Sequence, residues 1–134
     1  MEKQQDINVL VFEKDREIIN MILPLLKKKG YDNINTCLHK KEIKGILGEK
    51  TYGLAVIGEI DGYNSPFDAL KDIIMMSPMT SVILISDLSE REVHEKAEGY
   101  GIIGHVKRTI PPDDIFLLLE QFEKILAVIP PSME

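Results

Sequence analysis

The sequence predicts an α/β fold: a flavodoxin-like, doubly wound, three-layer sandwich with a five-stranded parallel sheet in the order 2-1-3-4-5 and five helices. Short apolar runs alternate with amphipathic helical patterns along the whole 134-residue chain. One of these runs, Leu54–Ile57, is apolar at every position, which is typical of a strand that helices cover on both faces. Strands and helices that alternate in this way form parallel sheets with right-handed crossovers.

The first half of the chain predicts three strands and two helices. Residues 7–12 form an apolar run that is typical of a buried strand. Residues 15–29 carry apolar side chains at helical spacing and end on three lysines before Gly30, the usual pattern at a helix C-terminus. Pro24 lies within this helix and is expected to kink it or to cost up to about 3 kcal/mol. The remaining elements are a short strand, a short helix with one apolar face, and the strand described above, at residues 33–37, 40–47 and 54–57.

The second half predicts two more strands and three helices after a turn-rich loop over residues 58–66. Ser89 and Glu92 form a capping box for the second of these helices, which we expect to end near Gly99. The last helix has apolar residues three and four positions apart throughout its length. The expected elements, in chain order, lie at residues 67–76, 81–85, 89–99, 103–107 and 112–126.

The composition indicates one globular domain, over residues 1–126, with residues 127–134 as a tail or the start of a linker. The 28% of charged residues include 16 basic and 22 acidic side chains, and residues 61–134 hold 13 of the acidic and only 6 of the basic ones. We therefore expect no nucleic-acid binding by this domain. No apolar run is long enough to cross a membrane and no signal-peptide pattern opens the chain, so we expect a cytoplasmic protein without a membrane partner.

Two patterns resemble ligand sites but occur in the wrong structural context. Residues 99–104 match the dinucleotide-binding pattern G-x-G-x-x-G, but here a helix leads into a strand, whereas the pyrophosphate needs a helix N-terminus. We interpret the glycines as a helix C-cap and a tight turn. His39, His94 and His105 lack the spacing of metal ligands, and Cys37 on a strand is typical of a small core residue. We therefore predict no metal site.

Function in doubly wound sheets lies at the carboxyl ends of the strands, where this chain carries polar residues. The residues at these ends are Glu13, Lys14 and Asp15 after the first strand, Gly58 and Glu59 after the third, Ser86 and Asp87 after the fourth, and Arg108 and Thr109 after the fifth. At these points the chain resembles the receiver domain (CheY-like) of two-component response regulators. The resemblance extends over nearly the whole chain and rests on residues 9–15, 52–58, 82–86 and 104–115. It implies a role in phosphorelay signal transduction.

The chain departs from the receiver pattern where the family's chemistry takes place. The resemblance implies two carboxylates after the first strand and a phospho-accepting aspartate on the third, which together hold Mg²⁺. It also implies a switch hydroxyl, a switch aromatic residue and a Lys-Pro pair. The residues found at these positions are Glu13, Lys14, Gly58, Ser86, His105, Arg108 and Thr109. We therefore expect a degenerate pocket with no bound Mg²⁺, no other cofactor and no enzymatic activity. The chain is interpreted as a phosphorylation-independent pseudo-receiver that acts as a protein-interaction module.

Two other interpretations remain open. In the first, Glu59 or Asp61 replaces the missing acceptor and the domain is phosphorylated, whereas the simpler alternative is that Glu59 only neutralises Lys14. In either case the ammonium of Lys14, beside Glu13 and Glu59, takes the place of the missing metal. In the second, Lys14, Arg108 and the space left by Gly58 hold an anion or another small ligand.

The receiver resemblance implies that the face made by residues 89–99, 103–107 and 112–126 binds a signalling partner, a second copy, or both. On this face we select Val93, Glu95, Phe116 and Leu117, because helical geometry places Leu117 opposite the core stripe of its helix. Arg91 with Glu95, and Glu92 with Lys96, are expected to pair along the fourth helix. His105, at the position of the switch aromatic residue, is expected to keep one orientation.

Overall fold

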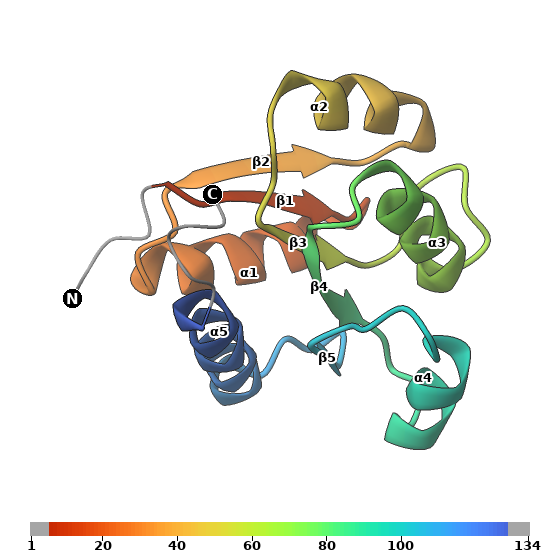
Figure 1. Cartoon of the computed structure of the whole chain (residues 1–134). Coiled ribbons are helices and arrows are strands. Elements are labelled where there is room, and N and C mark those ends of the chain that lie inside the picture. Colours follow the sequence, from red (N-terminus) through yellow and green to blue (C-terminus); the bar gives the residue numbers. More distant parts are fainter. Residues whose placement is uncertain (1–5, 129–134) are drawn as a thin grey trace.

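The computed structural model describes residues 6–128 and has one five-stranded sheet, drawn in Figure 1. The strands are β1 (Asn8–Phe12), β2 (Asn33–Cys37), β3 (Leu54–Ile57), β4 (Ser81–Ile85) and β5 (Gly104–Val106). All four neighbouring pairs are parallel, and the order is β2-β1-β3-β4-β5. This confirms the predicted fold class and strand order.

Helices cover both faces of the sheet, as the apolar strands predict. They are α1 (Arg16–Lys28), α2 (Ile43–Glu49) with a preceding 3₁₀ turn η1 (Lys40–Glu42), α3 (Pro66–Met76), α4 (Glu90–Lys96) and α5 (Pro112–Ala127). In Figure 1, α1 and α5 lie on one side of the sheet, and α2, α3 and α4 on the other. Within residues 6–128, no helix has the length and apolar character needed to cross a membrane.

The strand side chains alternate between two hydrophobic cores, because successive residues of a strand point to opposite faces of the sheet. Val9 and Val11 pack with the helices α1 and α5. Leu10 and Phe12 pack with α2, α3 and α4. All four side chains are fully buried, so β1 lies at the centre of the sandwich and its carboxyl end is held from both sides.

Local interactions at the helix ends explain where the helices begin. Asp15 caps α1 by accepting a hydrogen bond of 2.9 Å from the backbone N–H of Glu17. The predicted capping box of Ser89 and Glu92 is present at the start of α4. The first three residues of the predicted second helix form the 3₁₀ turn η1, so that the α-helix itself begins at Ile43. The helix α1 continues through Pro24 as one helix.

The fourth helix is shorter than predicted. It ends at Lys96 rather than near Gly99, and the backbone N–H of Ala97 bonds to the carbonyl of Val93. Gly99 and Gly101 then adopt positive φ angles of 87° and 65°, which glycine tolerates and other residues rarely adopt. Gly99 and Gly101 therefore form the turn that leads back to β5, as predicted, whereas the expected C-cap role of the glycines is wrong, because Ala97 is the C-cap and Gly104 lies in β5.

The buried cysteine behaves as a core residue. Cys37 is fully buried at the end of β2, and its Sγ lies 3.4 Å from the carbonyl oxygen of His39. Burial raises the pKa of its thiol to about 11, so the reactive thiolate is scarce at neutral pH. The last helix includes Ala127, one residue beyond the predicted domain boundary, and residues 129–134 of the predicted tail lie outside the described part of the chain.

Because Pro24 is exposed and lacks a backbone donor, we expect Pro24→Ala to raise the free energy of unfolding by about 2 kcal/mol. Urea unfolding followed by circular dichroism measures the change. Lys27→Ala, at an exposed position of the same helix whose donor is intact, should alter stability by less than about 0.5 kcal/mol. A Pro24→Ala protein no more stable than the parent would contradict this prediction.

Candidate functional site

The site is organised by Glu13, a carboxylate that is 0% exposed at the carboxyl end of β1. Its Oε1 accepts hydrogen bonds from the backbone N–H of Glu59 at 3.1 Å and from Nη1 of Arg108 at 3.0 Å. Its Oε2 accepts from the backbone N–H of Asp15 at 2.9 Å and from Nη2 of Arg108 at 3.1 Å. Each oxygen therefore has two donors, which is what allows a charged carboxylate to remain buried.

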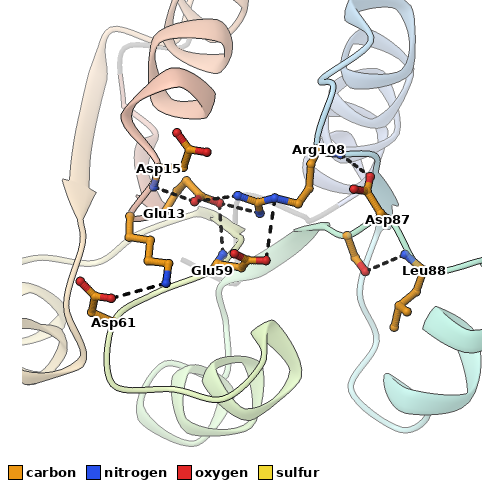
Figure 2. A network of polar contacts seen from close by, with 9 residues as sticks. Glu13, Asp15, Glu59, Asp61, Asp87, Leu88 and Arg108 are labelled. Atoms are coloured by element: carbon orange, nitrogen blue, oxygen red, sulfur yellow. Dashed lines mark hydrogen bonds and ion pairs between the residues drawn. The ribbon is translucent and has the colours of Figure 1, made fainter.

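Arg108 forms a two-pronged contact with this carboxylate from the loop after β5. Figure 2 shows its guanidinium lying against Glu13, with the carboxylate of Glu59 beside Nε at 3.9 Å. The backbone N–H of Arg108 donates to Oδ1 of Asp87 at 2.9 Å, which fixes the loop. Burial alone lowers the pKa of Arg108, but the hydrogen bond and charge of Glu13, aided by Glu59 and Asp15, outweigh it and raise the pKa. The guanidinium is therefore permanently charged.

The space beside Gly58 is filled. A Cβ built at this position would collide with Oε1 of Glu13 and would lie 3.1 Å from its Cδ and 3.4 Å from Cδ1 of Ile85. The expectation that Gly58 leaves room for an anion is therefore wrong, because the carboxylate of Glu13 takes that room.

Lys14 does not belong to the core of the site. Its Nζ lies 3.6 Å from Oδ1 of Asp61, and both side chains are about half exposed. The expected pair of Lys14 with Glu59 is wrong, since Glu59 faces Arg108 and meets Lys14 only through its carbonyl oxygen, which accepts from the Lys14 N–H at 2.7 Å. Arg108, rather than Lys14, supplies the positive charge at the centre.

The switch positions lie in two different hollows. Ser86 is buried, and its Oγ accepts a hydrogen bond of 3.2 Å from the N–H of Leu88. It lines a pocket of about 490 Å³ together with Arg108 and Glu59. His105 is only partly buried and lines a separate hollow of about 400 Å³ against α4. The structure thus brings together Glu13, Gly58, Glu59, Ser86 and Arg108, and leaves out Lys14, Asp61 and His105.

Two residues at the carboxyl ends of the strands contribute contacts that the sequence pattern does not indicate. Asp87 accepts from the Arg108 backbone, and the N–H of Asp15 donates to Glu13. The signal for Asp15 was its place as the N-cap of α1, which directs the chain back over Glu13. Within residues 6–128, no three histidine, cysteine, aspartate or glutamate side chains are grouped as metal ligands would be.

Solved structures of response regulator receivers have the same architecture. A two-component response regulator from Clostridium difficile gives a TM-score of 0.75 at 14% identity, over 88% of this chain and 96% of its own. A CheY-like receiver domain protein from Methanospirillum hungatei gives 0.72 at 14%, over 88% and 94%. A response regulator from Burkholderia pseudomallei, solved with a phosphorylated aspartic acid, a calcium ion and citrate, gives 0.70 at 15%, over 91% and 72%. The chain has the receiver fold.

The comparison is one of structure alone. No protein-family model and no curated protein matches the sequence. At identities of 14% and 15%, the TM-scores of 0.70–0.75 establish the fold alone, and the chemistry of the site has to be argued from this chain's own residues.

The four residues selected on the α4–β5–α5 face differ in their exposure to solvent. Leu117 is 54% exposed, and Glu95 is exposed and pairs with Arg91 at 3.2 Å, as expected. Phe116 is partly buried, with Nζ of Lys29 4.6 Å from its ring centroid. Val93 is 2% exposed, so its assignment to a contact surface is wrong: its side chain anchors α4 to the core.

We expect Arg108→Met to lower the free energy of unfolding by about 3–5 kcal/mol, because the buried Glu13 carboxylate would lose its counter-charge. Urea titrations at neutral pH measure this loss. Arg91→Met, which breaks an exposed pair, should cost less than about 0.5 kcal/mol. Equal effects of the two substitutions would argue against the central place of Arg108.

Gly58→Ala should destabilise the domain by about 1–3 kcal/mol, because the added methyl group requires Glu13 to move. The same substitution at Gly45 in α2 meets no atom within 4 Å and should instead stabilise by about 0.5–1 kcal/mol. Thermal unfolding of the two variants gives the comparison. A Gly58→Ala protein as stable as the parent would show that the site is looser than described.

Proposed function

We propose that this receiver-fold domain works without phosphorylation, as a protein-interaction module in signal transduction. The observation that carries the proposal is the two-pronged contact between Arg108 and Glu13, which places a fixed cation on the buried carboxylate. In receivers, as the resemblance implies, carboxylates at this edge hold Mg²⁺ and an aspartate accepts the phosphoryl group. Here an internal side chain supplies the positive charge permanently.

The donor set does not fit a divalent cation. Both oxygens of Glu13 already accept two hydrogen bonds each, and the charged guanidinium of Arg108 would repel a metal ion. The acceptor position holds Gly58, which has no nucleophile. Glu59 faces Arg108, and Asp61 faces Lys14, so both candidate replacements are already neutralised by cations. These contacts support a pocket held in one state.

We expect the amide NMR signals of Ser86, His105 and Arg108 to stay in place when beryllofluoride and millimolar Mg²⁺ are added, because Arg108 already occupies both oxygens of the Glu13 carboxylate. Incubation with acetyl phosphate should add no phosphoryl mass to the intact protein. Mg²⁺ alone is the control for ionic effects. Saturable shifts at these three residues, or a phosphorylated species, would replace this proposal by a receiver whose acceptor is Glu59 or Asp61.

With a fixed pocket, the surface carries the proposed function. The exposed side of α4 and α5 offers Leu117 among carboxylates, and α4 is acidic and short, with seven residues and Val93 as its one buried side chain. An exposed leucine surrounded by charge is the kind of feature that a partner protein can use as an anchor.

Leu117→Arg combined with Glu95→Lys should abolish binding to a signalling partner or to a second copy, while circular dichroism shows an unchanged fold. Both side chains are exposed, so the substitutions disturb the surface and leave the core intact. The matched control, Met21→Arg with Glu17→Lys on α1, should leave association unchanged. Association of the Leu117 variant at the level of the parent, measured by sedimentation, would exclude this face.

A further inference from the structure

A groove lies between η1, α2 and α3. In Figure 1, α2 lies beside β2 at one edge of the sheet, and α4 lies toward β5 at the other edge. It consists of two adjoining hollows of about 380 and 310 Å³ that share Lys40, Gly62, Tyr63 and Asp72. The candidate site described above contributes no residue to either hollow. We refer to this feature as the α2–α3 groove.

The larger hollow of the groove has a mainly apolar lining, and the ring of Tyr63 within it is fixed. The Tyr63 hydroxyl donates to Oδ2 of Asp72 at 2.6 Å, and the Lys40 ammonium lies 4.8 Å from the centroid of the same ring. The ring is therefore held in place before any ligand arrives. Met76 lines the groove and is 39% exposed. Methionine side chains adapt to the shape of a partner.

The rim of the groove is positive, although the whole chain has a net charge of −6. Four lysines line the two hollows, against Asp68 and Asp72. Asp72 is engaged by the Tyr63 hydroxyl. Within residues 6–128, the rim lysines Lys41, Lys44 and Lys71 have no ion-pair partner. A positive rim around an apolar floor suits an acidic segment that presents an apolar side chain.

The chain itself carries such a segment on α5. Leu117 is 54% exposed. Three exposed carboxylates lie near it on the same helix: Asp113 four positions before it, Asp114 three positions before it, and Glu120 three positions after it. At these helical spacings, the three carboxylates surround the leucine on one face. None of the three forms an ion pair within residues 6–128. We refer to these four residues as the Leu117 ridge.

We propose that the α2–α3 groove binds the Leu117 ridge of a second copy of this chain. Leu117 would enter the hollow over Tyr63 and Met76, and the three carboxylates would meet the rim lysines. The inference rests on the proposed function, because both use the exposed surface of α5 for binding. It specifies that the partner of this surface is a second copy of the chain. It also adds a second surface, which the proposed function does not contain.

The fold makes this contact an intermolecular one. The helix α5 covers the opposite face of the sheet from α2 and α3, so a chain cannot place its own ridge in its own groove (Figure 1). Since the two surfaces differ, the contact is head-to-tail and leaves one free groove and one free ridge at the ends of every assembly. Association should therefore extend beyond dimers as the concentration rises, and it should weaken at least tenfold between about 20 and about 500 mM salt.

Sedimentation velocity tests the inference with two variants that damage opposite sides of the contact. One carries Lys41→Glu and Lys44→Glu in the groove, and the other carries Leu117→Arg on the ridge. Each variant alone should be monomeric, because each lacks one half of the contact. Mixed in equal amounts, they should form a one-to-one complex and nothing larger, since only one intact groove and one intact ridge can meet.

A double variant with the same charge change, Lys27→Glu and Lys107→Glu, should associate like the parent, and circular dichroism verifies that all variants fold. A parent protein that stays monomeric at low salt overturns the inference and leaves the phosphorylation-independent pocket standing. Association lost with Leu117→Arg but kept in the groove variant also overturns it, and shows that the α4–β5–α5 face binds symmetrically. Mixed variants that form no complex overturn it as well.

Discussion

The buried ion pair between Glu13 and Arg108 is the constraint on which the rest of the site depends. A carboxylate without water or a counter-charge is costly to bury, so the chain around Glu13 is arranged to provide donors. Three segments supply them: the start of α1, the loop after β3 and the loop after β5. The pair therefore joins loops from three strands of the sheet, and Asp87 brings the loop after β4 into the same arrangement.

The fold could be predicted from the sequence because it follows from a repeating pattern that local residues carry. Runs such as Leu54–Ile57 identify buried strands without knowledge of their neighbours, and the strand order follows from general rules of connection. Helix ends were less predictable: α4 ends at Lys96, three residues early, with Ala97 as its C-cap, and the chain then turns through Gly99 and Gly101. The sequence placed the right residues at the carboxyl edge of the sheet.

The contacts within the site could not be predicted in the same way, because they depend on side-chain directions between segments far apart in the chain. From the sequence, Lys14 and Glu59 are expected to pair, because Lys14 follows the first strand and Glu59 follows the third, and these strands are neighbours. The structure directs Lys14 outward to Asp61, and brings Arg108, 95 residues from Glu13, into the centre. The assignment of Val93 to a surface was wrong for a related reason. The helix α4 has only seven residues, and Val93 is the residue that packs it against the core, so its side chain is buried.

The close approach of Glu13 to Gly58 also bears on how such a domain can change over generations. A side chain at position 58 cannot be accommodated until Glu13 withdraws, and withdrawal of Glu13 leaves the guanidinium of Arg108 without its partner. A substitution that adds a side chain at position 58 alone therefore gives a less stable protein. The residues at positions 13, 58 and 108 are thus coupled, and a change at one of them favours compensating changes at the others.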